Sequence, residues 1–319
     1  MTNSVAIRHP RFKRAPSMHE CALTSRDLDI LACVESYRLL SSEHLQALIP
    51  GSAQGLLRRL QKLFHAGYLD RLLPRRVAAG GSARMVYAIT NRGIRALAEH
   101  GRLEDPSQTD WNANNRSLHD LSIRHALLVS QVRAVMELAA ATRSNLRLLF
   151  WREGHDLQDA VEVSLPEGYR RVPVAPDAYF ALEDAKGRMN FFLEADRGTM
   201  TLKRFTAKLK AYAAYFEERR QQDKFGIRYF RVLTVTTSPA RTQNLVSAAT
   251  AEDDVRALGR MFLFADDTTL SLSSPERVLG NIWTAVTGER ICLISSPCTG
   301  PKQQPDGGGD HEHKQTSLR

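Results

Sequence analysis

The sequence predicts an α+β protein in which a small helix-rich domain precedes a larger domain of mixed α/β type. Three stretches with apolar residues at helical spacing come first, over residues 24–66, and two strand-like runs follow them. From residue 117 onward, helical and strand-like runs alternate, which is typical of a layered α/β domain. Residues 1–100 hold 15 Lys and Arg against 7 Asp and Glu, in a chain with a net charge of +9. The first domain is therefore expected to meet a polyanion, for which nucleic acid is the natural candidate.

The N-terminal domain, expected over residues 21–100, has the element order of a winged helix-turn-helix. Each of its three leading helices begins at a hydroxyl residue that can cap it: Thr24 or Ser25, Ser41 or Ser42, and Ser52. Two strand-like runs over 68–90 enclose a glycine-rich basic loop, and Asn91 caps a last helix over 92–100. In this fold the third helix enters the major groove of DNA and the hairpin contacts the backbone.

Polar and basic side chains lie where this fold would contact double-stranded DNA. They are Gln54, Arg58, Arg59 and Lys62 on the third helix, and Arg75, Arg76 and Arg84 at the hairpin. Amide and guanidinium groups suit base edges, and cations suit phosphates. The alternative is a solvated basic face on a domain that mediates protein contacts; the charge asymmetry favours DNA.

Three further segments complete the expected domain plan. Residues 1–20 are expected to form a flexible basic arm. Residues 101–116 are polar and without periodicity, so we expect a linker there, in which Trp111 can dock on one domain. Residues 296–319 are rich in Gly, Pro and polar residues and are expected to be disordered. The second domain then covers residues 117–295.

The second domain is predicted to alternate helices and strands. The expected elements are a helix over 118–141, a strand over 145–151, a loop over 152–168, a strand over 172–182, a strand from 191, a helix capped by Thr201, a buried strand over 229–236, a helix over 239–258, a strand over 261–264 and a helix over 275–286. The histidines of the first helix, His119 and His125, are expected to be packing residues.

Carboxylates gather at the ends of two of these strands. Side chains alternate along a strand, so Glu194 and Asp196 are expected on one face. If the strands pair through the turn at 183–188, Asp177 comes near Glu194. Lys208 and Tyr212 follow one turn apart on the next helix. Three converging carboxylates suit Mg²⁺ or Mn²⁺, and a lysine beside them could activate water or bind a phosphate.

The order of these motifs resembles the PD-(D/E)xK restriction-endonuclease-like fold. Pro176-Asp177 matches its first motif, and Glu194-Ala195-Asp196 matches its second except at the last position, where Asp196 replaces lysine. The resemblance implies metal binding by Asp177 and Glu194 and catalytic roles for these two residues, Asp196 and Lys208, the last as a lysine relocated onto the helix. The missing lysine leaves strand cleavage open. The other interpretation is that these acids are solvated or pair with neighbours such as Arg197 and Lys203.

Several motifs taken in order resemble the replication-relaxation family of plasmids and integrative elements. They are Y-A-I-T-N-R-G from Tyr87, H-D-L-S-I-R-H-A-L-L from His119, P-D-A-Y-F from Pro176, and L-E-A-D-R-G-T followed by K-L-K-A-Y. The resemblance spans residues 24–236. It implies DNA binding linked to replication, mobilisation or relaxation of supercoiled DNA.

Three functions stay open on this basis. The first is a DNA-binding accessory protein of a plasmid or integrative element, whose degenerate nuclease domain serves dimerisation or binds replication or transfer proteins; the Asp at the lysine position favours it. The second is a Mg²⁺-dependent nuclease or nickase, which the presence of all three acids favours. The third is a winged-helix transcriptional regulator, which needs only the first domain.

Other classes of function are not supported. There is no run of about 18 apolar residues, so no membrane span is expected. The four cysteines match no zinc module, and free thiols in a reducing cytoplasm are expected. Phosphate-binding glycine motifs and the G-x-S-x-G motif are absent from the sequence, so nucleotide binding and serine hydrolase chemistry are unsupported.

Overall fold

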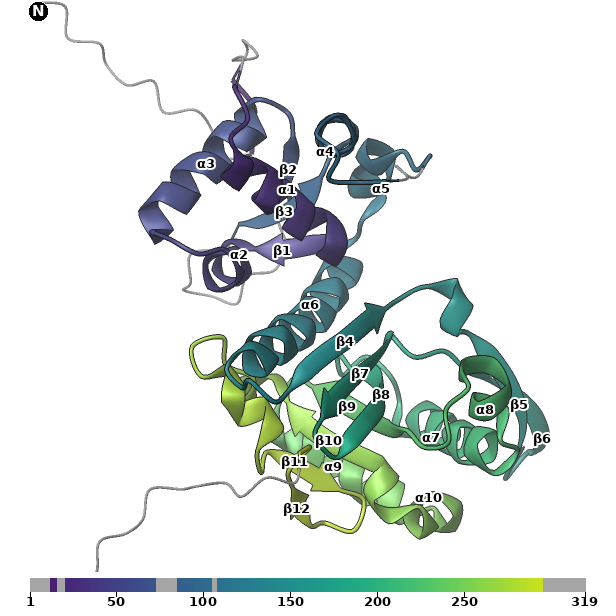
Figure 1. The fold of residues 1–319 in the computed structure, drawn as a ribbon. Helices are drawn as coiled ribbons and strands as arrows, with labels where there is room; N and C mark the ends of the chain where they lie inside the picture. Colours follow the sequence, from purple (N-terminus) through teal and green to yellow (C-terminus); the bar gives the residue numbers. More distant parts are fainter. Residues whose placement is uncertain (1–11, 16–20, 73–84, 105–107, 295–319) are drawn as a thin grey trace, which may run out of the picture.

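The computed structural model describes residues 12–15, 21–72, 85–104 and 108–294. Figure 1 shows a smaller N-terminal unit and a larger C-terminal unit, with helix α6 (Asp120–Ala141) running between them. Three predicted features lie wholly or mostly outside the described residues: the hairpin tip with Arg75, Arg76 and Arg84, the greater part of the arm 1–20, and the tail 296–319.

In its described residues, the N-terminal unit combines four helices with a three-stranded antiparallel sheet of order β1-β3-β2. Its elements are α1 (Ser25–Tyr37), β1 (Leu39–Ser41), α2 (Ser42–Leu48), α3 (Ala53–His65), β2 (Leu69–Leu72), β3 (Val86–Ile89) and α4 (Asn91–Glu99). Hydroxyl side chains cap the helices as the sequence predicts, at Thr24, Ser41 and Ser52. The last helix starts one residue earlier than predicted, because Thr90 rather than Asn91 accepts the capping hydrogen bond.

A buried ion pair fixes α3 against α1. The side chain of Asp27 is fully buried, and Nε of Arg59 donates to its Oδ1 at 2.6 Å while a second guanidinium nitrogen donates to Oδ2. Thr24 donates its backbone N–H to the same carboxylate at 2.7 Å. Burial alone would raise the pKa of Asp27, but the hydrogen bonds from Arg59 and Thr24 outweigh it and lower that pKa. The carboxylate thus both caps α1 and holds the neighbouring helix.

Part of the predicted flexible arm is bound to the N-terminal unit. The guanidinium group of Arg14 donates to the backbone carbonyls of Phe64 and Leu69, each at 3.0 Å, and pairs with Asp70 at 2.5 Å. Arg14 is therefore held against the N-terminal unit, within a segment for which the sequence predicts a flexible arm. Its guanidinium group can do this because it offers several N–H donors, which here reach two carbonyls and one carboxylate.

The predicted linker contains a helix, α5 (Trp111–Ser117). The buried amide of Asn115 donates to Asp70 at 2.9 Å and to the backbone carbonyl of Ile89 at 2.8 Å. Trp111 packs against the core of the N-terminal unit. Polar side chains hold this helix in place, so apolar periodicity could not reveal it.

The C-terminal unit is built on a seven-stranded mixed sheet of order β12-β11-β10-β9-β8-β7-β4. Strands β8, β9 and β10 are parallel, and the other neighbours are antiparallel. The strands are β4 (Arg147–Arg152), β7 (Ala178–Asp184), β8 (Gly187–Ala195), β9 (Arg231–Thr236), β10 (Phe262–Asp266), β11 (Trp283–Ala285) and β12 (Arg290–Ile291). The helices beside α6 are α7 (Leu202–Glu217), α8 (Arg220–Phe225), α9 (Pro239–Thr250) and α10 (Asp253–Ala257), with short 3-10 turns η1 (His155–Leu157), η2 (Gly259–Met261), η3 (Asp267–Thr269) and η4 (Pro275–Leu279).

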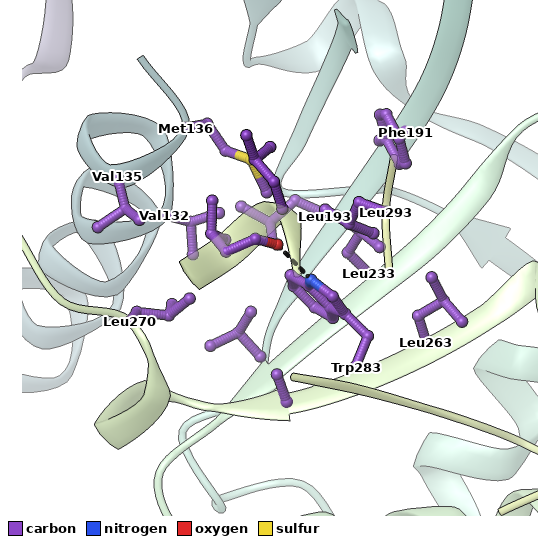
Figure 2. Packing of buried hydrophobic residues seen from close by; sticks show 14 of the residues in the cluster. Val132, Val135, Met136, Phe191, Leu193, Leu233, Leu263, Leu270, Trp283 and Leu293 are labelled. Carbon is purple, nitrogen blue, oxygen red and sulfur yellow. Dashed lines mark hydrogen bonds between the residues drawn. The ribbon is translucent and has the colours of Figure 1, made fainter. Parts of the chain in front are cut away.

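Helices cover both faces of this sheet, and strand alternation decides which side chain meets which helix. Leu193 of β8 packs with α6 on one face, and Phe192 packs with α7 and α9 on the other. Figure 2 shows the α6 side, where Trp283 is surrounded by side chains from α6 and from the strands. The indole N–H of Trp283 donates to the backbone carbonyl of Val278 at 2.7 Å, so the buried ring leaves no orphaned polar atom.

Residues 152–182 differ from the predicted loop and single strand. They form β5 (Asp159–Leu165) and β6 (Gly168–Val174), which pair as a separate hairpin, and then β7. The chain leaves extended pairing at 175–177, around Pro176, because proline cannot donate to a strand ladder. This break places Asp177 just before β7, where its backbone N–H still donates to the carbonyl of Leu193 in β8.

Two C-terminal segments also differ from prediction. The helix predicted over 239–258 is divided into α9 and α10, and the helix predicted over 275–286 is the short turn η4 followed by strand β11. Apolar residues spaced for a helix in the second segment instead fill the core from a 3-10 turn and a strand, because Trp283 packs into the sheet.

None of the helices within the described residues combines the length and the apolar composition needed to cross a membrane.

Replacing Asp27 should destabilise the N-terminal unit strongly. Asp27→Ala leaves the Arg59 guanidinium without its partner and removes the cap of α1, so we expect a loss of about 3 kcal/mol in the free energy of unfolding. Urea unfolding followed by circular dichroism measures it. The matched control is Asp29→Ala, which breaks the exposed pair with Arg102 and should cost less than about 1 kcal/mol. Equal losses in the two variants would contradict a special role for the buried pair.

Candidate functional site

The β7–β8 hairpin brings Asp177 and Glu194 together. Ala178 pairs with Leu193 in the hairpin, and the backbone N–H of Asp177 donates to the carbonyl of Leu193 at 2.9 Å. The Asp177 carboxylate then accepts the backbone N–H of Ala195 at 2.7 Å. Asp177, which precedes β7, therefore lies beside the end of β8, because the antiparallel register of the two strands pairs the start of β7 with the end of β8.

Helix α7 supplies two donors to Glu194. The Lys208 ammonium group donates to Oε2 of Glu194, and the Tyr212 hydroxyl donates to Oε1 at 2.5 Å. Residues four apart on a helix lie on the same face, so one face of α7 presents both groups to one carboxylate. The side chain of Glu194 is only 8% exposed and that of Lys208 is 20% exposed, so this is a largely buried ion pair.

Helix α6 supplies the partner of Asp177. Nε2 of His125 donates to Oδ1 of Asp177 at 3.0 Å. The hydrogen bond that His125 donates to Asp177 is the main cause that raises the pKa of His125, against the opposing effect of burial. A positive charge on His125 is therefore stabilised beside the carboxylate.

Asp196 does not join the other two carboxylates. Although it shares a sheet face with Glu194, its carboxylate accepts the hydroxyl of Thr236 at 2.8 Å and Nε of Arg241 at 2.9 Å. Arg241 lies on α9, whereas the partners of Glu194 lie on α7. All three predicted carboxyl residues line the same cavity, but the carboxylate of Asp196 is paired with an arginine from a neighbouring helix.

These residues border a cavity of about 630 Å³ between the two units, which we call the junction cavity. Its wall carries charged groups of both signs: Arg38, His125, Glu153, Asp177, Glu194, Asp196, Arg197 and Lys208. Arg38 comes from the N-terminal unit and the others from the C-terminal unit. The cavity could therefore hold an anionic group close to the two carboxylates.

Burial decides the charge state of the carboxyl groups at this cavity. It raises the pKa of Glu194 to about 7; Lys208 counteracts this effect and Asp177 adds to it. Glu153 is exposed by surface area, but desolvation by the protein around it also raises the pKa of its carboxyl group, which accepts the Trp151 indole N–H at 2.6 Å. A glutamate with a pKa near neutrality can exchange a proton at physiological pH.

The residues at the cavity fit a divalent metal ion only in part. A magnesium ion commonly takes one or two carboxylates and completes its shell with water and substrate phosphates, which Asp177 and Glu194 could satisfy. Within the ranges that the structure describes, no group of three His, Cys, Asp or Glu side chains is placed to hold a metal. Lys208 supplies the positive charge next to Glu194 in this arrangement.

The predicted DNA-contacting residues of α3 divide into two sets. Gln54, Arg58 and Lys62 are exposed along one face of the helix, opposite the buried leucines of its other face. Arg59 does not join this exposed set, because its guanidinium group forms a salt bridge with the buried carboxylate of Asp27. The three hairpin arginines lie outside the described residues.

The sequence interpretation missed two of the cavity residues. His125 was expected to be a packing residue, and its pairing with Asp177 depends on the docking of α6 on the sheet. Arg38 follows directly after α1, where no pattern marked it. The sequence feature that could have marked Arg38 is its basic side chain at the end of a helix, but basic residues are common at helix ends and do not by themselves indicate a site.

The replication-relaxation family matches residues 31–228, more than half of the chain. The protein therefore belongs to the replication-relaxation family. No curated protein matches the chain.

One solved structure shows a weak similarity. It is that of the restriction endonuclease FokI, at 11% sequence identity and a TM-score of 0.30. The match covers 79% of this chain but only 43% of the FokI chain, so this protein spans less than half of it. A TM-score this low does not assign a fold or a function.

Glu194→Gln should change how stability depends on pH. The folded chain holds the Glu194 proton up to about pH 7, against an ordinary value of 4.5, so its contribution to stability is full below pH 4.5 and is lost as the pH rises through about 7. Relative to Glu194→Gln, the wild type should thus lose roughly 2–4 kcal/mol between these pH values. Urea unfolding at a series of pH values measures this difference.

The control for this experiment is Glu183→Gln, at the far end of the same hairpin, where the glutamate pairs with Arg147 near the surface. Its difference from wild type should be nearly constant over the same range. A difference between wild type and Glu194→Gln that stays constant or grows with pH would contradict a raised Glu194 pKa.

Proposed function

We propose that this protein is a double-stranded DNA-binding accessory protein that acts in the replication, mobilisation or relaxation of a plasmid or integrative element. The observation that carries the proposal is the exposed face of α3, where Gln54, Arg58 and Lys62 follow one another at one-turn spacing. Membership of the replication-relaxation family supports it.

The proposal treats the N-terminal unit as a winged helix-turn-helix. The order helix, strand, helix, helix, strand, strand and the sheet order β1-β3-β2 support it. In that fold the third helix occupies the major groove, and α3 is the third helix here. Its buried face holds Leu56, Leu60 and Leu63, so the opposite face is the one that remains to contact DNA.

Charge placement agrees with this orientation. The guanidinium group of Arg14 lies at the end of α3, where it is 40% exposed, and Arg58 and Lys62 lie on the helix itself. Cations on one side of a domain attract the phosphate backbone and release its counterions, which makes binding depend on salt. Gln54 offers an amide, which can donate to and accept from base edges.

The double variant Arg58→Ala/Lys62→Ala should weaken DNA binding and reduce its salt dependence. Each lost phosphate contact lowers the slope of log K against log salt by about 0.9, so we expect a slope smaller by about 1 to 2. Fluorescence anisotropy with a labelled duplex from the cognate element, over about 50 to about 200 mM salt, measures it.

A charge-matched control is Arg170→Ala/Arg171→Ala, which removes two exposed arginines from the β6 strand of the other unit. Its slope should stay within the error of the wild type. An unchanged slope in the α3 variant, with a reduced slope in the control, would move the DNA-binding surface away from α3.

A second candidate function is phosphodiester hydrolysis at the junction cavity, because Asp177, Glu194 and Lys208 converge there. The order α6, β4, β7, β8, α7, β9 also supports a restriction-endonuclease-like core. Asp177 would hold a magnesium ion, which would supply positive charge to the phosphate oxygens. Glu194, with its pKa near 7, would act as general base and not as a metal ligand: it would accept a proton from water as the water oxygen attacks phosphorus. The P–O bond to the leaving oxygen would break, and that oxygen would take up a proton from solvent. The Lys208 ammonium group would stabilise the negative charge of the phosphate.

The test is incubation of supercoiled plasmid with purified protein and Mg²⁺ or Mn²⁺. If the second function holds, the wild type nicks or relaxes the plasmid, and Glu194→Gln lowers the rate by about 100-fold or more, as loss of a general base does. The control Glu183→Gln should keep the wild-type rate. An unchanged plasmid that still shifts on a gel would remove the hydrolytic function and leave the DNA-binding proposal intact.

A further inference from the structure

The corner between α1 and β1 has an unfavourable backbone conformation. Arg38, which joins the two elements, has φ 66° and ψ −53°. Among the described residues, Arg219 is the other non-glycine residue with a positive φ. A side chain crowds the backbone in this region, so the conformation persists only where surrounding contacts impose it.

Helix α6 provides contacts on both sides of Arg38. The Tyr37 hydroxyl donates to Glu137 at 2.7 Å, and the Ser130 hydroxyl donates to the backbone carbonyl of Leu39 at 2.7 Å. The guanidinium group of Arg133 also donates to the carbonyl of Ser36. The residues next to Arg38 are thus bound to the helix that carries His125 of the site.

The Arg38 side chain is directed to the junction cavity and is not committed elsewhere. It lines the cavity together with Lys208 and Arg197. In the part of the chain that the structure describes, its guanidinium group makes no hydrogen bond or salt bridge, and the residue is exposed. Across the cavity, desolvation raises the pKa of Glu153, and the charges of Arg133 and Arg38 oppose that rise.

We propose that Arg38 binds a phosphate of the DNA backbone at the mouth of the junction cavity and so completes, from the N-terminal unit, a site whose other groups belong to the C-terminal unit. A guanidinium group offers two parallel N–H donors that match two phosphate oxygens. Lys208 is already paired with Glu194, so the uncommitted Arg38 is the better phosphate ligand at this cavity. The inference rests on the proposed DNA-binding function and adds a second place of contact to it.

This arrangement makes the cavity site depend on docking of the two units. The charge of Arg38 reaches the cavity only while the α1–β1 corner is held on α6. The DNA contact at α3 and the DNA contact at the cavity can be measured separately, because an exposed leucine near each of them can be replaced by a cross-linking residue.

Photo-cross-linking to a duplex of the cognate element tests the proposal. The photoreactive residue p-azidophenylalanine is placed either at Leu121, which lines the cavity and is 64% exposed, or at Leu57, which is 43% exposed on α3. Cross-linking from both positions is expected in the otherwise wild-type chain. If the probe at position 57 cross-links and the probe at position 121 does not, the inference is overturned and the proposed function stands. If neither probe cross-links to the duplex, the proposed DNA-binding function is overturned as well.

The role of Arg38 itself is tested by Arg38→Gly. Glycine suits a φ of 66°, so this variant removes the guanidinium group without straining the fold, and its Tm should equal or exceed that of wild type. Cross-linking from Leu121 should fall about tenfold, as expected for the loss of a charge-assisted hydrogen bond, while cross-linking from Leu57 should change little.

Two further variants make the result specific. Arg38→Lys keeps the positive charge and should restore part of the cross-linking, and Arg95→Ala removes an exposed arginine of α4 and should leave it at the wild-type level. Unchanged cross-linking from Leu121 in Arg38→Gly, or an equal fall in Arg95→Ala, would overturn the assignment of Arg38.

Discussion

The docking of α6 is the constraint on which the rest of the structure depends. This helix has apolar contacts on both sides: Ala134 lies in the core of the N-terminal unit, whereas Val132 and Met136 lie in the core of the large sheet. A helix buried on several faces cannot show a single apolar stripe, and its place is set by the two surfaces that enclose it. Because His125 lies on the same helix, the packing that joins the units also positions a partner of Asp177.

The two acids of the E-x-D motif have similar positions on one strand but different partners from the neighbouring helices. Glu194 and Asp196 share one face of the sheet, yet Glu194 meets a lysine and a tyrosine from α7, and Asp196 meets an arginine from α9. Burial leaves Glu194 with a raised pKa despite its cation. Asp196 instead holds two elements together. Both carboxylates are thus held by cations, but the two cations come from different helices.

Much of the local structure could be predicted from the sequence, because local rules decide it. Hydroxyl caps and apolar spacing were sufficient for α1, α2, α3 and α7, and the β-formers before Thr236 were sufficient for β9. The predictions failed where no such rule acts. Helix α5 is held by polar contacts of Asn115, and β5 and β6 form a hairpin outside the main sheet. The predicted last helix became a turn and strand β11, because Trp283 packs into the sheet core.

Short-range patterns in the chain were enough to find residues that could carry chemistry. Asp177, Glu194 and Lys208 followed from strand alternation and helical spacing, and Arg58 and Lys62 from the face of one helix, because these periodicities act over a few residues. Which of these residues meet depends on the packing of elements that are distant in the sequence. Asp196 and Arg59 are committed to partners 45 and 32 residues away, and His125 and Arg38 reach the cavity through the docking of α6. Such long-range pairings depend on how packed elements face one another, which no local pattern of the chain records.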